Sequence, residues 1–463
     1  MTSVQQDFKF LLDTLGQAVE IIGGQYADGL FDSQYQWQIV KDNVSESISN
    51  SRSTGVCLRK YQDGQWGYES SDNLSPTHIL EMARRIKDFN PYVSRPIKLM
   101  KDLPYLTLDK EIQVKIDPRS KSSEEKLARI RELHRLASSY DPRIVNVRVV
   151  YRQQLMERIM ATSTGSRLRQ VIPRTRFFIF CTAKEGNVTD QDYLTLGGTK
   201  GYEIVENLPE EKIKGTVDSA LEQLKAQSPP KGNLPVILDP SMVGITCHES
   251  FGHGLEADQV LRNRSYLSAL KGKSVASPLV TIYEDSIVDG GHGTYFFDDD
   301  GVPARKNVIV EKGILVGFLH DIMTASALNE NLTANSRAEG TRYRRFPRMT
   351  NTYAGVGEMS SEELIKDTKY AVMLVHASHG MEDPLGGGMQ IGSNKGYIIE
   401  NGEKKQPLKS ITLSGRVLDV LRDVDAVSND DFHLGLGMCG KGNEDFVPES
   451  SGGSTWRTKG IVG

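Results

Sequence analysis

The apolar and polar positions of the chain follow three patterns in succession. Between residues 8 and 22, apolar side chains recur every three to four positions, which predicts an amphipathic helix. Residues 26–68 carry short aromatic and β-branched runs separated by Asp-Gly and Asn-Ser turns, a pattern typical of an antiparallel meander. A helix is expected over 75–89, where a Ser-Pro pair suits the N-cap and the first turn. These elements predict an N-terminal α+β unit over residues 1–90.

A proline-rich connector separates this unit from a second α+β unit, predicted over residues 91–230. Ser122 and Glu125 form a capping box at the start of a helix that is expected to end near Ser139. The further expected elements are strands at 145–151 and 174–181 and a helix at 213–224. Two consecutive prolines then mark the second boundary.

The third pattern covers residues 231–463, where glycine is frequent, β-like runs dominate and helices are few and short. A strand is expected at 234–238, and hairpins are expected at 307–319 and 396–403. We therefore predict an α+β fold. Two units of antiparallel sheet flanked by helices are followed by a mostly β C-terminal domain, a barrel or a sandwich, against which one helix with candidate metal ligands lies.

The composition of the chain disfavours several classes of function. The 463 residues carry a formal net charge of −4, without the basic surplus that is usual in nucleic-acid binders. The start has no secretory signal, and no run of about 18 apolar residues follows, so no membrane span is expected. The four scattered cysteines do not make a disulfide framework in a chain of this size. This usage favours a cytoplasmic protein.

One short segment, H-E-x-x-x-H from His248 to His253, concentrates imidazole and carboxylate groups. Zinc proteases commonly carry H-E-x-x-H on a helix, where the histidines lie one turn apart and the glutamate activates a bound water. Here the histidines are five positions apart, and in an ideal helix such positions diverge by about 140°. A π-bulge, or a distortion at Gly252, would bring the rings together. We predict an irregular helix that is entered through Asp239 as N-cap and Pro240 at the first helical position.

A catalytic zinc needs a third protein ligand, and Cys439 is the favoured candidate because neighbouring glycines would let its thiolate approach closely. The competing metal candidates are His292, His376 and His379. Glu256 is interpreted either as a ligand or as an acceptor that orients an imidazole. A lone cysteine is more often a small buried residue, so the pattern alone leaves these alternatives open.

Two glycine-rich segments have other interpretations. Gly435, Gly437 and Gly440 spell G-x-G-x-x-G, but no βαβ unit surrounds them, which disfavours a dinucleotide loop. The run 386–388 lacks the Lys-Ser/Thr of a phosphate loop and is interpreted as a bulge or as a flexible turn beside the substrate.

The motifs together resemble the TldD/PmbA metalloprotease family, and specifically its catalytic TldD-type member. The resemblance covers nearly the whole chain and is carried by residues 26–28, 248–256, 299–303, 348–352, 386–388, 397–402 and 438–441. It implies a zinc peptidase in which His248, His253 and Cys439 hold the metal and Glu249 is the general base. The segment 443–449 departs from the family pattern.

The resemblance also implies partners: a homodimer, or a heterodimer with a related subunit that lacks the metal motif. Unfolded peptides or small disordered proteins are the implied substrates. In this hypothesis Glu249 takes a proton from zinc-activated water and passes it to the leaving amine. Extended substrates are expected to bind near Gly386, Gly387 and Gly388, by adding a strand to a sheet edge.

The alternative hypothesis is a non-catalytic scaffold subunit whose metal is structural, which a fourth ligand such as Glu256 or His379 would favour. A regulator that binds nucleic acid is disfavoured by the charge.

Overall fold

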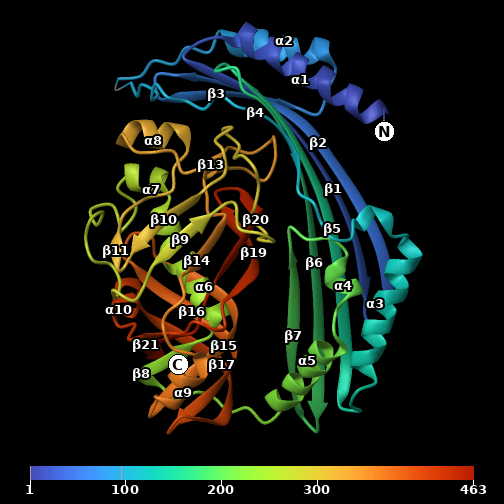
Figure 1. The fold of residues 1–463 in the computed structure, drawn as a ribbon, viewed down its shortest axis with the longest axis vertical. Coiled ribbons are helices and arrows are strands. Elements are labelled where there is room, and N and C mark those ends of the chain that lie inside the picture. Colours follow the sequence, from blue (N-terminus) through green and yellow to red (C-terminus); the bar gives the residue numbers. More distant parts are fainter. Residues whose placement is uncertain (1, 95) are drawn as a thin grey trace.

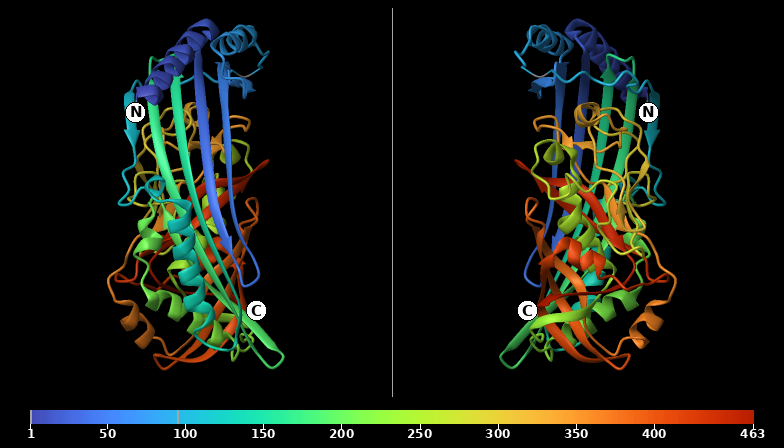
Figure 2. Two further views of the ribbon diagram at one scale, coloured as in Figure 1. Left: turned by 90° about the vertical axis from the view of Figure 1, so that its right-hand side faces the viewer. Right: turned by 90° about the vertical axis from the view of Figure 1, so that its left-hand side faces the viewer.

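The computed structural model describes residues 2–94 and 96–463, and it divides visually into an arched sheet with its helices and a β-rich C-terminal part (Figure 1). The sheet runs down one side of the molecule and curves over the top, where α1 and α2 lie. The C-terminal part sits within this arch, and the two side views in Figure 2 agree with this arrangement. The predicted α+β class is confirmed.

The arched sheet contains seven strands in the order β3-β2-β1-β5-β6-β4, with β7 also paired to β6. Its strands are β1 (Tyr26–Lys41), β2 (Glu46–Gln62), β3 (Gln65–Ser71), β4 (Thr107–Glu111), β5 (Ile144–Thr162), β6 (Arg167–Glu185) and β7 (Val188–Gly198). The meander is confirmed as β1-β2-β3. The strands predicted at 145–151 and 174–181 are parts of β5 and β6, which are each 19 residues long. Because β1 pairs with β5, residues from both predicted N-terminal units build this one sheet.

Helices cover the outer face of the arch. They are α1 (Thr2–Ile22), α2 (Pro76–Lys87), α3 (Ser123–Ser138), α4 (Glu203–Glu206) and α5 (Glu210–Gln223), with a short 3-10 turn at Pro118–Ser120. Odd-numbered residues of β1 point into this layer: Phe31 packs in a core with α1 and α2, and Trp37 packs in a core with α3 and α5. The predicted capping box at Ser122 and Glu125 is present. Since side chains alternate along a strand, the even-numbered residues face the C-terminal part.

Of the two predicted forms, a barrel or a sandwich, the C-terminal part contains a closed barrel. Its five strands close because β17 pairs with β21, and they are β8 (Gly232–Leu238), β15 (Tyr370–Glu382), β16 (Gly388–Glu400), β17 (Glu403–Arg416) and β21 (Trp456–Val462). The short β18 (Ala426–Val427) also pairs with β21. The hairpin predicted at 396–403 is the β16–β17 turn.

A second sheet lies beside the barrel, in the order β11-β10-β9-β14-β20-β19. Its strands are β9 (Ile282–Asp285), β10 (Lys306–Glu311), β11 (Ile314–Leu315), β14 (Asn351–Ala354), β19 (His433–Lys441) and β20 (Glu444–Gly453), and β12 (Ser336–Arg337) pairs separately with β13 (Phe346–Pro347). The predicted hairpin at 307–319 is present as β10–β11, although β11 is short. The helices of this part are α6 (Pro240–Ile245), α7 (Ala257–Leu261), α8 (Ile322–Leu328), α9 (Ser361–Lys366) and α10 (Val417–Arg422).

Buried ion pairs join the arch to the C-terminal part. Arg59 of β2 binds Asp28 at 2.5 Å and Asp300 at 2.6 Å, and all three side chains are buried. Arg158 of β5 binds Asp32 at 2.8 Å and also contacts Asp299. Removing one partner of such a pair leaves an uncompensated buried charge, so these contacts fix the arch over the C-terminal part. No helix among the described residues combines the length and apolar character that crossing a bilayer requires.

Candidate metal centre

The H-E-x-x-x-H segment continues directly from α6. Asp239 accepts a hydrogen bond from the backbone N–H of Met242 at 2.9 Å, and Pro240 occupies the first turn, which confirms the predicted start. A π-helical turn follows at Thr246–Phe251, and a 3-10 turn follows at Gly252–Leu255. The predicted irregular helix is therefore confirmed, in the form of a wide turn followed by a tight one.

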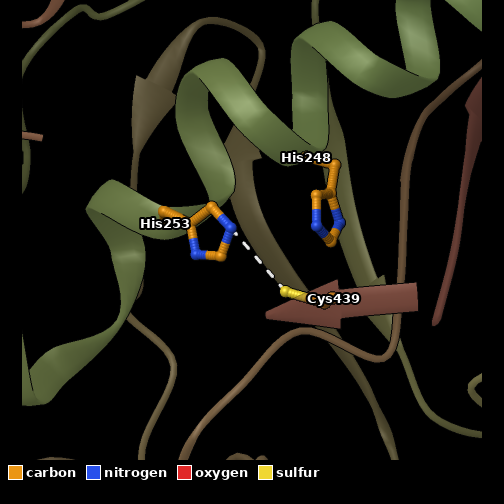
Figure 3. A group of neighbouring side chains, drawn as sticks. All are labelled: His248, His253 and Cys439. Carbon is orange, nitrogen blue, oxygen red and sulfur yellow. Dashed lines mark hydrogen bonds between the residues drawn. The ribbon is translucent and has the colours of Figure 1, made fainter. Parts of the chain in front are cut away.

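The wide turn brings the two histidine rings to the same side of the segment (Figure 3). Their centroids lie 5.4 Å apart, with the ring planes at 81°. The Sγ of Cys439, on β19, lies 3.7 Å from Nε2 of His253. One ligand atom from each of His248, His253 and Cys439 lies within 4.8 Å of the others. The structure thus brings together three predicted site residues from two distant segments.

The donor set fits zinc. With zinc–sulfur and zinc–nitrogen distances of about 2.3 Å and 2.0–2.1 Å, a tetrahedral site separates sulfur from nitrogen by about 3.6 Å. The distance between Cys439 Sγ and His253 Nε2 is 3.7 Å. Burial raises the pKa of Cys439, but the two neighbouring imidazoles outweigh it and hold the pKa well below its usual value. A thiolate is the form of cysteine that binds metals.

Buried carboxylates lie behind both imidazoles. The Oε2 of Glu449, on β20, lies 3.2 Å from Nδ1 of His248, and the Oε1 of Glu256 lies 3.4 Å from Nδ1 of His253. Glu256 also binds Lys441 at 2.9 Å. Carboxylates at this position fix the tautomer and the direction of a ligating imidazole. Of the two interpretations left open for Glu256, its contacts favour the orienting one.

Glu249 lies at the edge of the donor group. Its Oε2 is 3.9 Å from Nε2 of His253. Its side chain is 31% exposed, so solvent reaches it, whereas Glu256 is 2% exposed. Burial raises the pKa of Glu249, against the lowering effect of the two imidazoles. A partly exposed carboxylate beside a metal donor group is placed to accept and to donate a proton.

Glu382, at the end of β15, is a further acidic residue of this region that the sequence did not indicate. Both of its carboxylate oxygens are buried and have no hydrogen-bond partner among the described residues. Burial, together with the charges of Glu256 and Glu249, raises the pKa of Glu382 to about 8. It lies outside the motifs found in the sequence, so only the packing of β15 against the π-helical turn identifies it.

The other candidate residues lie apart from the donor group. His376 has a left-handed backbone with φ of 61°, and its Nδ1 lies 2.9 Å from Asp192 Oδ1 of β7. His379 contacts the neighbouring Ser378 at 3.0 Å. Among the described residues, neither belongs to the group that can hold a metal. His292 is also outside it and lines a separate cavity under the arch.

Gly386 and Gly387 lie between β15 and β16, and Gly388 is the first residue of β16, close to the end of the strand that carries Glu382. Gly387 has φ of +71° and accepts a hydrogen bond from the backbone N–H of Val417 at 2.9 Å. Tyr266 packs against this turn, about 3.1 Å from where a Cβ on Gly387 would lie. The turn is thus held in place on both sides.

Family models match most of the chain. The PmbA/TldA metallopeptidase C-terminal domain matches residues 231–461, the central domain matches 116–227 and domain 1 matches 35–88. The donor group falls within the first of these matches.

Curated relatives align over nearly their full length. A metalloprotease of Methanocaldococcus jannaschii is 35% identical, over 97% of this chain and 99% of its own. A zinc metalloprotease TldD homolog of Saccharolobus solfataricus is 28% identical, over 95% of this chain and 96% of its own.

Solved structures share the fold. A Thermotoga maritima protein named as a proposed modulator of a DNA gyrase has a TM-score of 0.79 at 22% identity, covering 99% of this chain and 100% of its own. TldE of Thermococcus kodakarensis has a TM-score of 0.76 at 16% identity, covering 98% of this chain and 99% of its own.

Proposed function

The chain belongs to the PmbA/TldD family of metallopeptidases, and from this membership we propose that it is a zinc-dependent peptidase that cleaves unfolded or extended peptides. One observation carries the proposal: the π-helical turn aims His248 and His253 at Cys439, so that three donors lie within 4.8 Å of one another. Two imidazoles and a thiolate form a ligand set suited to zinc.

The number of donors supports an enzyme over a scaffold with a structural metal. Structural zinc sites use four protein ligands, whereas catalytic sites use three and keep one position open. Glu256 and His379 were the two candidates for a fourth ligand. Glu256 is engaged by His253 and Lys441, and His379 lies outside the described donor group.

The proposed chemistry assigns a separate role to each side chain. When bound, zinc supplies a Lewis acid that polarises a carbonyl oxygen and lowers the pKa of water. Glu249 accepts the proton from the attacking water and returns it to the leaving amine, since its carboxylate lies beside the donor group. Glu449 and Glu256 keep the imidazoles oriented. His248, His253 and Cys439 hold the metal.

A substrate path is proposed along exposed backbone near the site. β19, which carries Cys439, pairs only with β20 and is an edge strand of its sheet among the described strands. An extended peptide can add to such an edge through main-chain hydrogen bonds, which recognise unfolded chains without strict sequence preference. The turn at Gly386, Gly387 and Gly388 is the proposed second contact, where small residues permit close approach of a peptide backbone.

We further propose a dimer in the cytoplasm, either of two copies or with a related subunit that lacks the motif. The fold shared with TldE supports the second form. All four cysteines are unpaired and buried, which is consistent with a reducing compartment. No nucleic acid or membrane is part of the proposal. The mass of the purified protein in solution, alone and after adding a motif-lacking family member, tests the assembly.

The function is tested by comparing the intact chain with Glu249→Gln. Zinc per chain is measured by elemental analysis, and hydrolysis is measured with reduced casein as an unfolded substrate. We expect both proteins to retain zinc and only the intact chain to cleave. Glu124→Gln, at an exposed position of α3, is the matched control.

Two outcomes would contradict the proposal. Cleavage by zinc-loaded Glu249→Gln at the rate of the intact chain would show that Glu249 is not the general base. If the chain takes up no zinc when it is incubated with zinc, the assignment of a zinc site is wrong. If the intact chain binds zinc and cleaves only after a motif-lacking subunit is added, the proposed heterodimer is supported.

A further inference from the structure

A cavity of about 320 Å³ lies between the inner face of the arched sheet and the β19–β20 hairpin. Met438 lines this cavity, whereas its neighbour Cys439 belongs to the donor group. Because adjacent side chains of a strand point to opposite faces, β19 separates the cavity from the metal centre. Its volume is at the lower end of the range for small-ligand sites, about 300–1,000 Å³.

The strand register gathers polar side chains on the wall formed by the arch. Gln36 on β1 is opposite Gln154 on β5, and Gln154 is opposite Arg174 on β6. Two residues along, Gln38, Arg152 and Arg176 form the next row. The residues that share this wall and line the cavity are Gln34, Gln36, Gln38, Ser49, Ser51, Arg152, Gln154, Arg174 and Arg176. The wall therefore combines amide groups with three guanidinium groups.

None of the three guanidinium groups is paired with a carboxylate in the described part of the chain. Arg176 is half-buried, and no hydrogen bond or ion pair links it to a described residue. Arg174 is buried and donates to the backbone carbonyls of His292 at 2.7 Å and Thr294 at 3.2 Å. Arg152 donates to Gln38 Oε1 at 2.9 Å. Burial and neighbouring arginines lower the pKa of Arg176 to about 10 and that of Arg174 to about 9.

The opposite wall offers little negative charge to them. Glu339 is the one acidic residue among the described lining residues, and its Oε2 accepts the backbone N–H groups of Asp445 at 3.1 Å and Phe446 at 3.2 Å. The Glu339 carboxylate is therefore held at the β20 end of the cavity by these two backbone amides. The cavity thus has a surplus of positive charge that the described residues around it do not neutralise.

His292 supplies an independent observation at the same place. Its side chain is 1% exposed, it lines the cavity, and neither ring nitrogen has a hydrogen-bond partner among the described residues. Burial and the neighbouring arginines keep the pKa of His292 well below its usual value, so the ring is neutral. A neutral imidazole offers one donor and one acceptor. Buried polar atoms are normally paired, and here the free ring atoms adjoin the cavity.

We propose that this cavity binds a carboxylate, carried on an acidic side chain or at the C-terminus of a peptide, with Arg176 as the main anchor. Arg152, Arg174 and His292 surround the anion, and the glutamine amides contact the adjoining peptide groups. Arginine presents a planar pair of donors that matches the two oxygens of a carboxylate. That the carboxylate belongs to a peptide rests on the proposed peptidase function. The binding site itself does not.

Binding without turnover tests the proposal. Zinc-loaded Glu249→Gln protein is titrated by calorimetry with three N-acetylated peptides: acetyl-Ala-Ala-Gln-amide, acetyl-Ala-Ala-Glu-amide and acetyl-Ala-Ala-Gln with a free carboxyl end. We expect at least one of the carboxylate peptides to bind about 10- to 100-fold more tightly than the neutral peptide. Arg176→Gln should abolish this difference, and Arg176→Lys should keep part of it, since the charge remains but the paired donors do not.

Arg135→Gln, at an exposed position on the outer helix α3, is the matched control and should bind like its parent. If only the peptide with the glutamate side chain binds, the site recognises acidic residues. If only the peptide with the free carboxyl end binds, the site recognises the C-terminus of a peptide. The proposal is overturned if the neutral peptide binds as tightly as both others, or if carboxylate binding survives Arg176→Gln in a protein with an unchanged circular dichroism spectrum. Binding lost on zinc removal but unchanged by Arg176→Gln would also overturn it, because it would place the carboxylate on the metal. Hydrolysis of casein by the intact chain is measured separately, so the peptidase function and the carboxylate site are tested independently of each other.

Discussion

Gly380 of β15 packs against the side chain of Glu249, and replacing it with alanine tests the role of that carboxylate without touching a metal donor. A methyl group on Gly380 would lie 2.5 Å from Cγ and 2.8 Å from Cβ of Glu249, and 3.1 Å from Cγ1 of Ile245. Gly380 is held in place by its pairing with Ile391 of β16. The strand therefore cannot retreat easily, and the clash falls on the π-helical turn.

The size of the effect follows from these distances. Carbon atoms of neighbouring side chains normally lie about 3.5–4.0 Å apart, so Glu249 must move by about 1–1.5 Å. A displacement of about 1 Å at a catalytic group reduces the rate about 100-fold, which corresponds to about 2.7 kcal/mol of activation free energy. Overpacking also costs about 1–3 kcal/mol of stability. The donors are not displaced directly, so zinc should remain bound.

The assay compares kcat/KM for reduced casein, zinc per chain and thermal midpoint in the intact chain, in Gly380→Ala and in Gly415→Ala. The last is the control, because a Cβ on Gly415 would lie 3.4 Å from the nearest atom, Cγ2 of Val420, an ordinary contact. We expect Gly380→Ala alone to lose about 100-fold in kcat/KM. Activity within about threefold of the intact chain, in a folded protein with full zinc, would refute the placement of Glu249 as the base.

Three further predictions concern charge and metal. Burial lowers the pKa of His376, but the hydrogen bond and charge of Asp192 outweigh it and raise the pKa above its usual value. The contribution of His376 to stability should therefore be full below about pH 6.5 and be lost as pH rises through the raised pKa. Urea unfolding across this range should show that loss in the intact chain and not in His376→Gln, and equal pH profiles would contradict the pairing. Lys441→Met should lower the free energy of unfolding by about 3–5 kcal/mol, because it leaves Glu256 buried beside an uncharged side chain. Lys184→Met, at an exposed position, is its control, and equal urea midpoints for the two variants would refute the prediction. Removing zinc with a chelator should lower the thermal midpoint and adding zinc should restore it, since a ligand of the folded state stabilises that state. A midpoint that does not respond to either step would argue against a bound metal.

Local signals predicted the start and the irregularity of the metal-bearing helix. The cap at Asp239 and the first-turn Pro240 are determined by neighbours in the sequence, and both are present. The five-residue spacing between His248 and His253 required an unusual turn if both rings were to meet one metal, and the π-helical turn supplies it. Hairpin turns were predictable for the same reason, because their geometry depends on a few adjacent residues.

The lengths of the strands could not be predicted from the pattern of apolar and polar residues. β5 continues past Tyr151, the last residue of the predicted strand, through Arg152, Gln153 and Gln154. These side chains line the cavity between the arch and the β19–β20 hairpin, and sequence periodicity does not distinguish the wall of a polar cavity from a solvent-exposed segment. The long sheet therefore appeared as separate short strands.

The residues that surround the metal donors could not be predicted from the sequence either. Glu449, Lys441 and Glu382 come from β20, β19 and β15, and none of them lies in the H-E-x-x-x-H segment. Their positions depend on how strands of two sheets pack around one turn, which is tertiary information. Cys439 was the exception, because its glycine-rich surroundings made it distinctive in the sequence.

The separation of the donors along the chain has a consequence for synthesis. His253 leaves the ribosome 186 residues before Cys439, which at about 5–20 residues per second is a delay of about 10–40 s. During that time the early histidines lack the thiolate of Cys439, and β21, which closes the barrel against β8 and β17, has not yet been made. The nascent chain therefore cannot assemble the donor group until β19 has emerged and packed, so the peptidase activity proposed for this chain is not available to it while the residues before β19 are being made.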